Sequence, residues 1–359
     1  MNIGCNLSLY NDNNKSDFLL YEDFLKIAVK VEDLGFDSIW TVEHHFSGHS
    51  PVPNGITLLS YLAGATKKII LGTSVIVLPW HNPIRVIEEM FMLDILSKGR
   101  VIFGFGRGTS RLEYDGFGIN MEESRLRFKE IIEIIKKSIL NETIQYEGLY
   151  YKIPLLSIRP RPFSMNLIDK LYAAAESPES VAIMADLGLG LFMTPKFDKI
   201  KEQSEVVKNY NHLMIQKHNN FSSPILRAYI CINENHEKAV ENAKKYSEKM
   251  FDILDIHYQF SKNNLKGVKS YEYFANSVVP YGDDVDLKNN ALSNFSKNHI
   301  IGNPEECVKQ IKKLYDATHM DHLILDFCYA GMDIEDCIES MKLFSEKVLP
   351  ILKDEEKFS

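Results

Sequence analysis

Eight short apolar segments recur along the chain, and amphipathic helical stretches separate them. Strand patterns that alternate with helix patterns indicate βα units and a parallel sheet. The eight segments lie at 3–9, 36–43, 68–78, 100–106, 171–175, 191–194, 226–232 and 322–327. Eight such units favour one closed barrel over two smaller domains. We therefore predict an α/β fold, a (β/α)₈ TIM barrel, as a single domain over residues 1–359.

Two of the intervening helices carry start signals. Asn82 with Pro83 is typical of an N-cap followed by the first helical residue. Asn120 with Glu123 three residues later resembles a capping box.

One long stretch interrupts the alternation. It covers roughly residues 246–301, between the seventh strand and the helix that begins at Pro304, and its later half is polar and rich in turn residues. Structureless segments of this length in compact domains are usually lids or disordered. We predict a lid beside the C-terminal face of the barrel, where barrel enzymes build their active sites.

Charge and cysteine content exclude several classes of protein. The net charge of −8 argues against a nucleic-acid or anionic-membrane partner. The chain has no run of 18 apolar residues, and its N-terminus lacks the pattern of a signal peptide. The five cysteines are scattered without a C-x-x-C pair, which indicates reduced thiols and no structural zinc. We expect a cytoplasmic protein.

Two histidines, His44 and His45, end the second strand. Adjacent strand residues point to opposite faces, so the pair is poorly placed to chelate one metal, and we predict no metal site. One histidine at this end of a barrel is well placed for acid/base chemistry, because its ordinary pKa lies near ~6.5. The alternative is two ordinary polar residues at a strand end.

Two arginines and one helix start predict an anion site. Arg107 follows a glycine-rich strand end, and its guanidinium suits a phosphate. Arg125 begins the next helix, where a surface pair with Glu122 is the alternative. Ser177 and Pro178 open a later helix, whose free N–H groups favour an anion. The alternative there is a capped helix without a ligand.

Two glutamates flank that helix start, Glu176 and Glu179. Their carboxylates would repel a phosphate unless they point away from it. The predicted anion site therefore depends on the arginines.

In their order and spacing these motifs resemble the bacterial luciferase-like flavin monooxygenase family, above all its catalytic alpha chain. The likeness covers essentially the whole chain. The strings that carry it lie at 36–46, 65–79, 93–100, 107–108, 124–125, 174–177, 302–307 and 341–353.

The resemblance implies an enzyme that binds reduced FMN (FMNH₂) and uses dioxygen through a flavin C4a-hydroperoxide, with oxidation of an aldehyde to a carboxylic acid as one candidate reaction. It implies that His44 is catalytic beside the isoalloxazine, and that Ser74-Val75 corresponds to the family's non-proline cis peptide. The implied contacts of the FMN phosphate and ribityl chain are Arg107, Arg125, Ala175, Glu176, Ser177 and Ser180.

Partners are also implied. A separate flavin reductase would supply FMNH₂, since no nicotinamide motif is visible. We expect a homodimer, or a heterodimer with a paralogue, because Gly64 lies between two alanines and permits close helix packing on the side through which relatives dimerise.

Ser74-Val75 replaces two alanines of the light-emitting members, and four further positions depart from them. Gly106 replaces a cysteine, Ser110 a tyrosine, Pro195 a tryptophan, and Ala228 a serine of the seventh strand. These positions line the flavin ring or the substrate pocket in the family, so aldehyde preference and light emission do not follow. Two alternatives stay open: a deazaflavin (F420)-dependent oxidoreductase, and a non-catalytic flavin-binding partner subunit.

Overall fold

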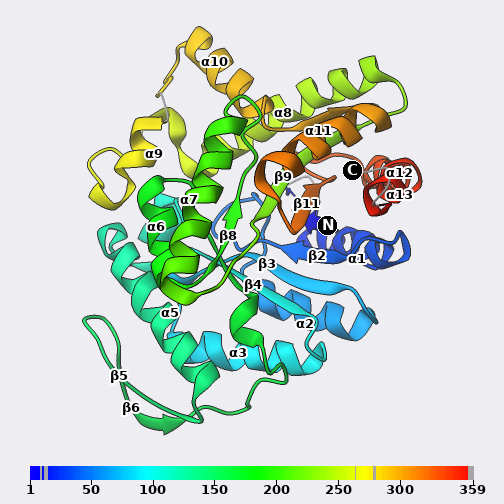
Figure 1. Ribbon diagram of the computed structural model, residues 1–359. Helices are drawn as coiled ribbons and strands as arrows, with labels where there is room; N and C mark the ends of the chain where they lie inside the picture. The colour runs from blue at the N-terminus through cyan, green and yellow to red at the C-terminus, as the bar shows by residue number, and fades with distance from the viewer. Residues whose placement is uncertain (9, 12–14, 263, 278–279, 355–359) are drawn as a thin grey trace.

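A closed parallel barrel of eight strands forms the centre of the molecule (Figure 1). The computed structural model describes residues 1–359 except 9, 12–14, 263, 278–279 and 355–359. Neighbouring strands run in the order β9-β11-β1-β2-β3-β4-β7-β8, and β8 pairs with β9 to close the ring. The strands are β1 (Asn2–Leu7), β2 (Ser38–Thr41), β3 (Ile70–Val77), β4 (Val101–Gly106), β7 (Leu171–Ala174), β8 (Gly190–Met193), β9 (Ile225–Ile232) and β11 (His322–Asp326). The predicted (β/α)₈ barrel is confirmed, and each strand lies at its expected place.

Helices surround the barrel and bury its outer face (Figure 1). The larger ones are α1 (Asp17–Asp33), α2 (Gly55–Ala65), α3 (Pro83–Leu96), α5 (Ser124–Leu140), α6 (Pro178–Leu187), α7 (Ile200–His218), α8 (His236–Tyr258), α11 (Pro304–Thr318) and α12 (Ile334–Lys347). Short helices α4 (Arg111–Phe117) and α13 (Leu349–Lys353) and a hairpin, β5 (Thr143–Glu147) with β6 (Lys152–Ser157), complete this layer.

Of the two predicted helix starts, one is confirmed and the other is wrong. The Asn82 side chain accepts from two backbone N–H groups of α3, as predicted. The capping box predicted at Asn120 and Glu123 is wrong. Asn120 instead caps a short 3₁₀ turn, η2 (Met121–Glu123), by accepting from the N–H of Glu122, and α5 begins only at Ser124.

The N-terminal end of the barrel is filled by a small apolar cluster around Trp40, which is fully buried. A Cβ at Gly72 would lie 2.1 Å from the Trp40 ring, so only glycine leaves room for the indole. The cluster is completed by Ile102, Phe192, Ile225 and Ile324. Because side chains close this end, the open space of the barrel lies at the opposite, C-terminal end.

The insertion before α11 is more helical than the sequence indicated. Helix α8 continues to Tyr258, since apolar residues at helical spacing bury one of its faces. The polar remainder forms 3₁₀ turns η4 (Phe260–Lys262) and η5 (Lys269–Tyr271), helices α9 (Glu272–Ser277) and α10 (Val285–Ser296), and strand β10 (Ile300–Gly302) beside β9. Residues 263 and 278–279 of the predicted lid lie outside the described residues.

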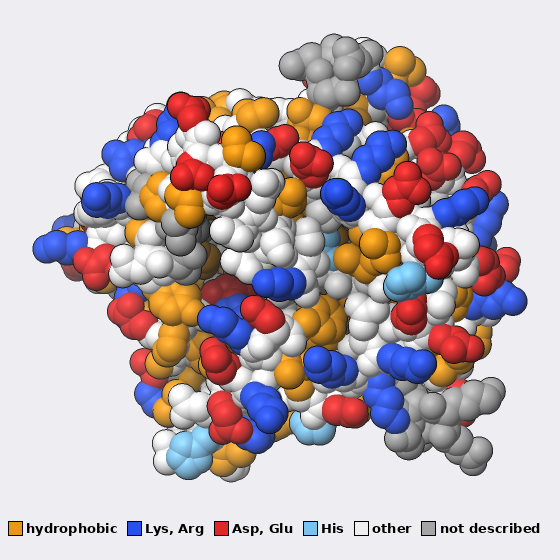
Figure 2. Space-filling model, turned by 90° about the horizontal axis from the view of Figure 1, so that it is seen from above, with side chains coloured by type: hydrophobic (Ala, Val, Ile, Leu, Met, Phe, Trp, Pro, Cys, Tyr) orange, Lys and Arg blue, Asp and Glu red, His pale blue; other side chains and the backbone are white. Residues whose placement is uncertain are grey.

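Charged side chains of both signs lie on the surface (Figure 2), and the thiols lie in the interior. Acidic and basic side chains are interspersed on the face in Figure 2. All five cysteines are buried and free. None of the helices in the described part of the chain has the length and apolar character needed to cross a membrane.

Candidate functional site

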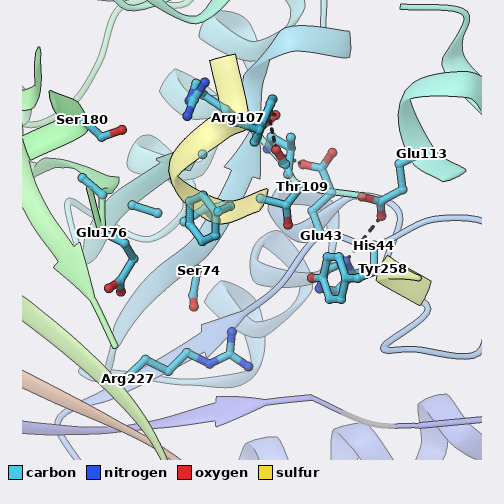
Figure 3. Close-up of a pocket in the computed structure, with 18 residues that line it drawn as sticks. Glu43, His44, Ser74, Arg107, Thr109, Glu113, Glu176, Ser180, Arg227 and Tyr258 are labelled. Carbon is cyan, nitrogen blue, oxygen red and sulfur yellow. Dashed lines mark hydrogen bonds and ion pairs between the residues drawn. The ribbon is translucent and has the colours of Figure 1, made fainter. Parts of the chain in front are cut away.

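A cavity of about 210 Å³ lies at the C-terminal ends of the barrel strands (Figure 3). Seven of the nine predicted site residues line it, and Arg125 and Ser177 lie beside it. The seven are His44, Ser74, Val75, Arg107, Ala175, Glu176 and Ser180. The peptide bond between Ser74 and Val75 is cis, as the resemblance implied. The structure therefore brings together side chains that lie more than a hundred residues apart in the sequence.

The two predicted arginines converge on one backbone oxygen. The carbonyl of Ser270 in η5 accepts from Arg107 Nη1 at 3.2 Å and from Arg125 Nη2 at 3.4 Å. Arg107 also lies over the Tyr271 ring, 4.6 Å from its centroid. Arg125 Nε is buried and has no hydrogen-bond partner in the part of the chain that the structure describes. This donor set, already aimed at an oxygen, fits a phosphate.

Arg125 does not form the alternative pair with Glu122. Its ion-pair partner is Glu179, at the start of α6. The carboxylate of Glu122 instead accepts from the backbone N–H of Lys269, at 2.9 Å, and so holds η5 in place.

The start of α6 faces the same side of the cavity. Ser177 is the N-cap, as predicted, and its hydroxyl accepts from the N–H of Ser180 at 3.1 Å. Glu176 is directed elsewhere, because its carboxylate accepts from the N–H of Thr194 at 2.9 Å and pairs with Lys196 at 2.7 Å. Glu179 pairs with Arg125, so each of the two glutamates is engaged by a cation.

His44 belongs to a buried cluster with one carboxylate and a second histidine. Its Nδ1 lies 3.4 Å from Glu113 Oε1, and His257 Nε2 lies 3.3 Å from the same oxygen. The backbone N–H of His45 also donates to this oxygen, at 2.9 Å. The His45 ring itself points away, with Nε2 3.2 Å from Glu43 Oε1. The two adjacent histidines therefore diverge, but they lie in the loop after β2, which ends at Thr41, and not on the strand itself.

These contacts determine the charge states of His44 and Glu113. Burial lowers the pKa of His44, and the contact with Glu113 opposes that effect only in part, so the ring is neutral at neutral pH. Burial acts to raise the pKa of Glu113, but the rings of His257 and His44 hold it at about 2. A carboxylate beside Nδ1 favours the tautomer with the proton on Nδ1, which leaves the lone pair of Nε2 free. His44 can therefore accept a proton at Nε2.

Glu43 fixes the loop that carries His44. Its buried carboxylate accepts from the Trp80 indole at 2.7 Å, from the N–H of Val77 at 3.1 Å, and lies 2.8 Å from His81 Nε2. Burial acts to raise the pKa of Glu43, yet the contacts with His45 and His81 leave it lowered, so the group stays ionised. It ties the end of β2 to the residues that follow β3.

The structure adds site residues that sequence reasoning did not find. Glu113 lies on α4, and His257 and Tyr258 come from the end of α8. Arg227 lines the cavity from β9, where a charged residue within the apolar run ILRAYICI was the available signal. The next residue, Ala228, is one of the positions expected to line the pocket, but it packs in the outer core. Alternate strand residues face opposite sides, so Arg227 and Ala228 cannot both face the cavity.

Replacing Glu113 by glutamine should move the acidic limb of the kcat/KM pH profile to lower pH. The carboxylate raises the pKa of His44 against burial, so its loss lowers that pKa further, and the ring stays neutral in more acidic solution. Turnover at neutral pH should also fall, since the ring loses its orienting partner. Asp115→Asn, at an exposed position of the same helix, is the control. A limb that stays fixed or moves upward would contradict this link.

Comparison with known proteins identifies the family. The sequence model described as "Luciferase-like monooxygenase" matches residues 8–322. The chain is 28% identical over 355 residues to an alkanal monooxygenase alpha chain of Photobacterium leiognathi, covering 96% of this chain and 97% of that protein.

Solved structures support the fold. The oxygenating constituent of 3,6-diketocamphane monooxygenase from Pseudomonas putida, in complex with FMN, superposes with a TM-score of 0.73 at 18% identity over 98% of each chain. An F420-dependent secondary alcohol dehydrogenase gives a TM-score of 0.71 at 17% identity over 98% of this chain and 99% of that one.

Proposed function

Because the chain belongs to the luciferase-like monooxygenase family, we propose that it is an FMNH₂-dependent enzyme that uses dioxygen to oxygenate a small carbonyl compound, with the oxidation of an aldehyde to a carboxylic acid as the reference reaction. The observation that carries the proposal is the convergence of Arg107 and Arg125 beside the start of α6. Bound reduced FMN would supply the electrons that activate dioxygen.

The phosphate of FMN would be held by three kinds of donor. Arg107 and Arg125 provide charge-assisted hydrogen bonds, and Arg125 Nε is a buried donor without a hydrogen-bond partner among the described residues. The N-terminus of α6 adds backbone N–H groups and the positive end of its dipole, next to the hydroxyls of Ser177 and Ser180.

The flavin ring would lie deeper in the cavity, over Ser74 and Val75 and close to His44. His44 holds or moves a proton at Nε2, because Glu113 engages its Nδ1. Aromatic side chains of the insertion, Tyr258, Tyr271 and Phe274, line the same cavity and would help to keep water from a bound flavin.

The F420-dependent structural relative supports a second candidate, hydride transfer without oxygen. The two functions differ in what they consume. A monooxygenase places one atom of O₂ in the product and the other in water, whereas a deazaflavin enzyme moves a hydride and leaves O₂ untouched. A non-catalytic flavin-binding subunit would bind FMN and yield no product.

The experiment that tests the proposal uses ¹⁸O₂. The protein is mixed with photoreduced FMN, ¹⁸O₂ and one of three aldehydes, decanal, benzaldehyde or 4-carboxybenzaldehyde, and the carboxylic acid is analysed by mass spectrometry. We expect one ¹⁸O atom per acid, in excess of the reaction without protein. A parallel anaerobic reaction contains reduced F420 and acetone. Reduction of acetone there, without labelled acid in the first reaction, would favour the deazaflavin function, and FMN binding without any product would favour the partner subunit.

We further propose that a separate reductase delivers FMNH₂ and that the chain dimerises, with itself or with a paralogue, through α2. Gly64 of α2 has no described atom within 4 Å of the position a Cβ would take, and Tyr61 on the same helix is 61% exposed. An open small-residue surface of this kind permits a second helix to pack closely.

A further inference from the structure

Arg227 brings a further positive charge into the cavity, apart from the two predicted arginines. It reaches in from β9 on the side opposite to Arg107 (Figure 3). Its side chain is mostly buried. A charge in such surroundings is energetically costly unless an opposite charge pairs with it.

A buried carboxylate pairs with Arg227 and fixes its orientation. Asp326 at the end of β11, which is 0% exposed, accepts from Arg227 Nε at 2.8 Å and from Nη2 at 3.1 Å. The amide of Asn6 donates to the same carboxylate at 2.6 Å. A side-on bidentate pair of this kind holds the planar guanidinium in one orientation.

The opposite end of the guanidinium is left for a ligand. Nη1 makes no hydrogen bond with any residue that the structure describes, and 22% of the side chain is exposed although the residue lines a cavity. Burial has the largest effect on the pKa of His44, but the charge of Arg227 also lowers it, which places the guanidinium within electrostatic reach of His44. A donor, a proton-accepting ring and the flavin pocket therefore share one space.

We propose that Arg227 is a substrate-recognition residue that binds an anionic oxygen, a carboxylate in its simplest form, on the compound that the enzyme oxygenates. The inference rests on the proposed function and names its substrate class. The cavity then has two anion sites at opposite sides, Arg107 with Arg125 for the cofactor phosphate and Arg227 for the substrate. A plain alkyl chain in contact with Arg227 would strip water from Nη1 without replacing the lost hydrogen bond, which disfavours an unsubstituted long-chain aldehyde.

The test measures binding separately from turnover. FMN-loaded protein is titrated by calorimetry with benzoate and with benzyl alcohol, two probes of similar shape that differ in charge. We expect benzoate to bind about tenfold or more tightly than benzyl alcohol, the scale of one charge-assisted hydrogen bond. In Arg227→Met this preference should fall to within about twofold, and Arg227→Lys should keep part of it. Arg85→Met, which removes an exposed arginine of α3, is the control and should keep the full preference.

Three results would overturn the assignment. The first is equal affinity of the two probes in the unaltered protein, and the second is a benzoate preference that survives in Arg227→Met. The third is a loss of FMN affinity in Arg227→Met with the preference retained, which would assign the guanidinium to the flavin ring. If Arg227→Met proves unfolded by circular dichroism, Arg227→Lys carries the comparison. Failure of FMN to bind the unaltered protein would instead overturn the proposed function.

Discussion

Replacement of His44 by alanine is expected to lower turnover by about 10² to 10⁴-fold, the usual contribution of a general acid or base. Glu113 orients the ring, and burial keeps it neutral, so its Nε2 is the proton acceptor that the variant lacks. FMN affinity should change only a few-fold, since the ring lies apart from Arg107, which would hold the phosphate (Figure 3). Steady-state product formation and FMN titration by fluorescence quenching measure the two quantities.

The neighbouring histidine provides the control for this variant. His45 is adjacent in sequence, but its ring is directed to Glu43 and does not line the cavity. His45→Gln, which keeps a donor for Glu43, should retain most of the turnover. Unchanged turnover in His44→Ala would remove His44 from the mechanism.

Replacement of Arg107 by alanine should weaken FMN binding by roughly 1.5–3 kcal/mol, the scale of a hydrogen bond to a charged group. That change corresponds to about a 10- to 150-fold rise in Kd. The effect should be specific to the phosphate. Arg107 Nη1 already donates to the carbonyl oxygen of Ser270, and a phosphate oxygen would accept from the same donor.

Riboflavin tests that specificity, since it has the ring of FMN without the phosphate. Its affinity, measured by the same titration, should be nearly equal in the unaltered protein and in Arg107→Ala. An equal loss for FMN and riboflavin would show that the arginine supports the pocket generally, and an unchanged Kd for FMN would refute the phosphate assignment.

The barrel could be predicted because its signals are local. Strand composition, helical periodicity and caps such as Asn82 depend on a few neighbouring residues, and eight repeats of one unit leave few other architectures. The prediction failed at Asn120, where the capping-box spacing is present but the backbone forms a 3₁₀ turn. The insertion was also predicted poorly, because the apolar face of α8 continues into a region where polar turn residues dominated the interpretation.

The site was predictable only where side chains carry recognisable chemistry near strand ends. His44, Arg107 and Ser177 met that condition, and the structure places them at or beside one cavity. Glu113 and His257 did not, because their role arises from long-range packing that joins α4 and α8 to the end of β2. At β9 the sequence interpretation chose the wrong one of two adjacent residues, and an error of one position on a strand exchanges the inner face for the outer.

The carbonyl of Ser270 has a consequence for how the protein acquires its cofactor. It occupies the point where both arginines converge, so a phosphate that used these two donors would displace it. If FMN binds in this way, the measured Kd would equal the intrinsic Kd divided by the fraction of molecules in which η5 has withdrawn. Glu122, which anchors η5 through the N–H of Lys269, would help to set that fraction from outside the cavity. The apparent affinity for FMN and the docking equilibrium of η5 would then be coupled.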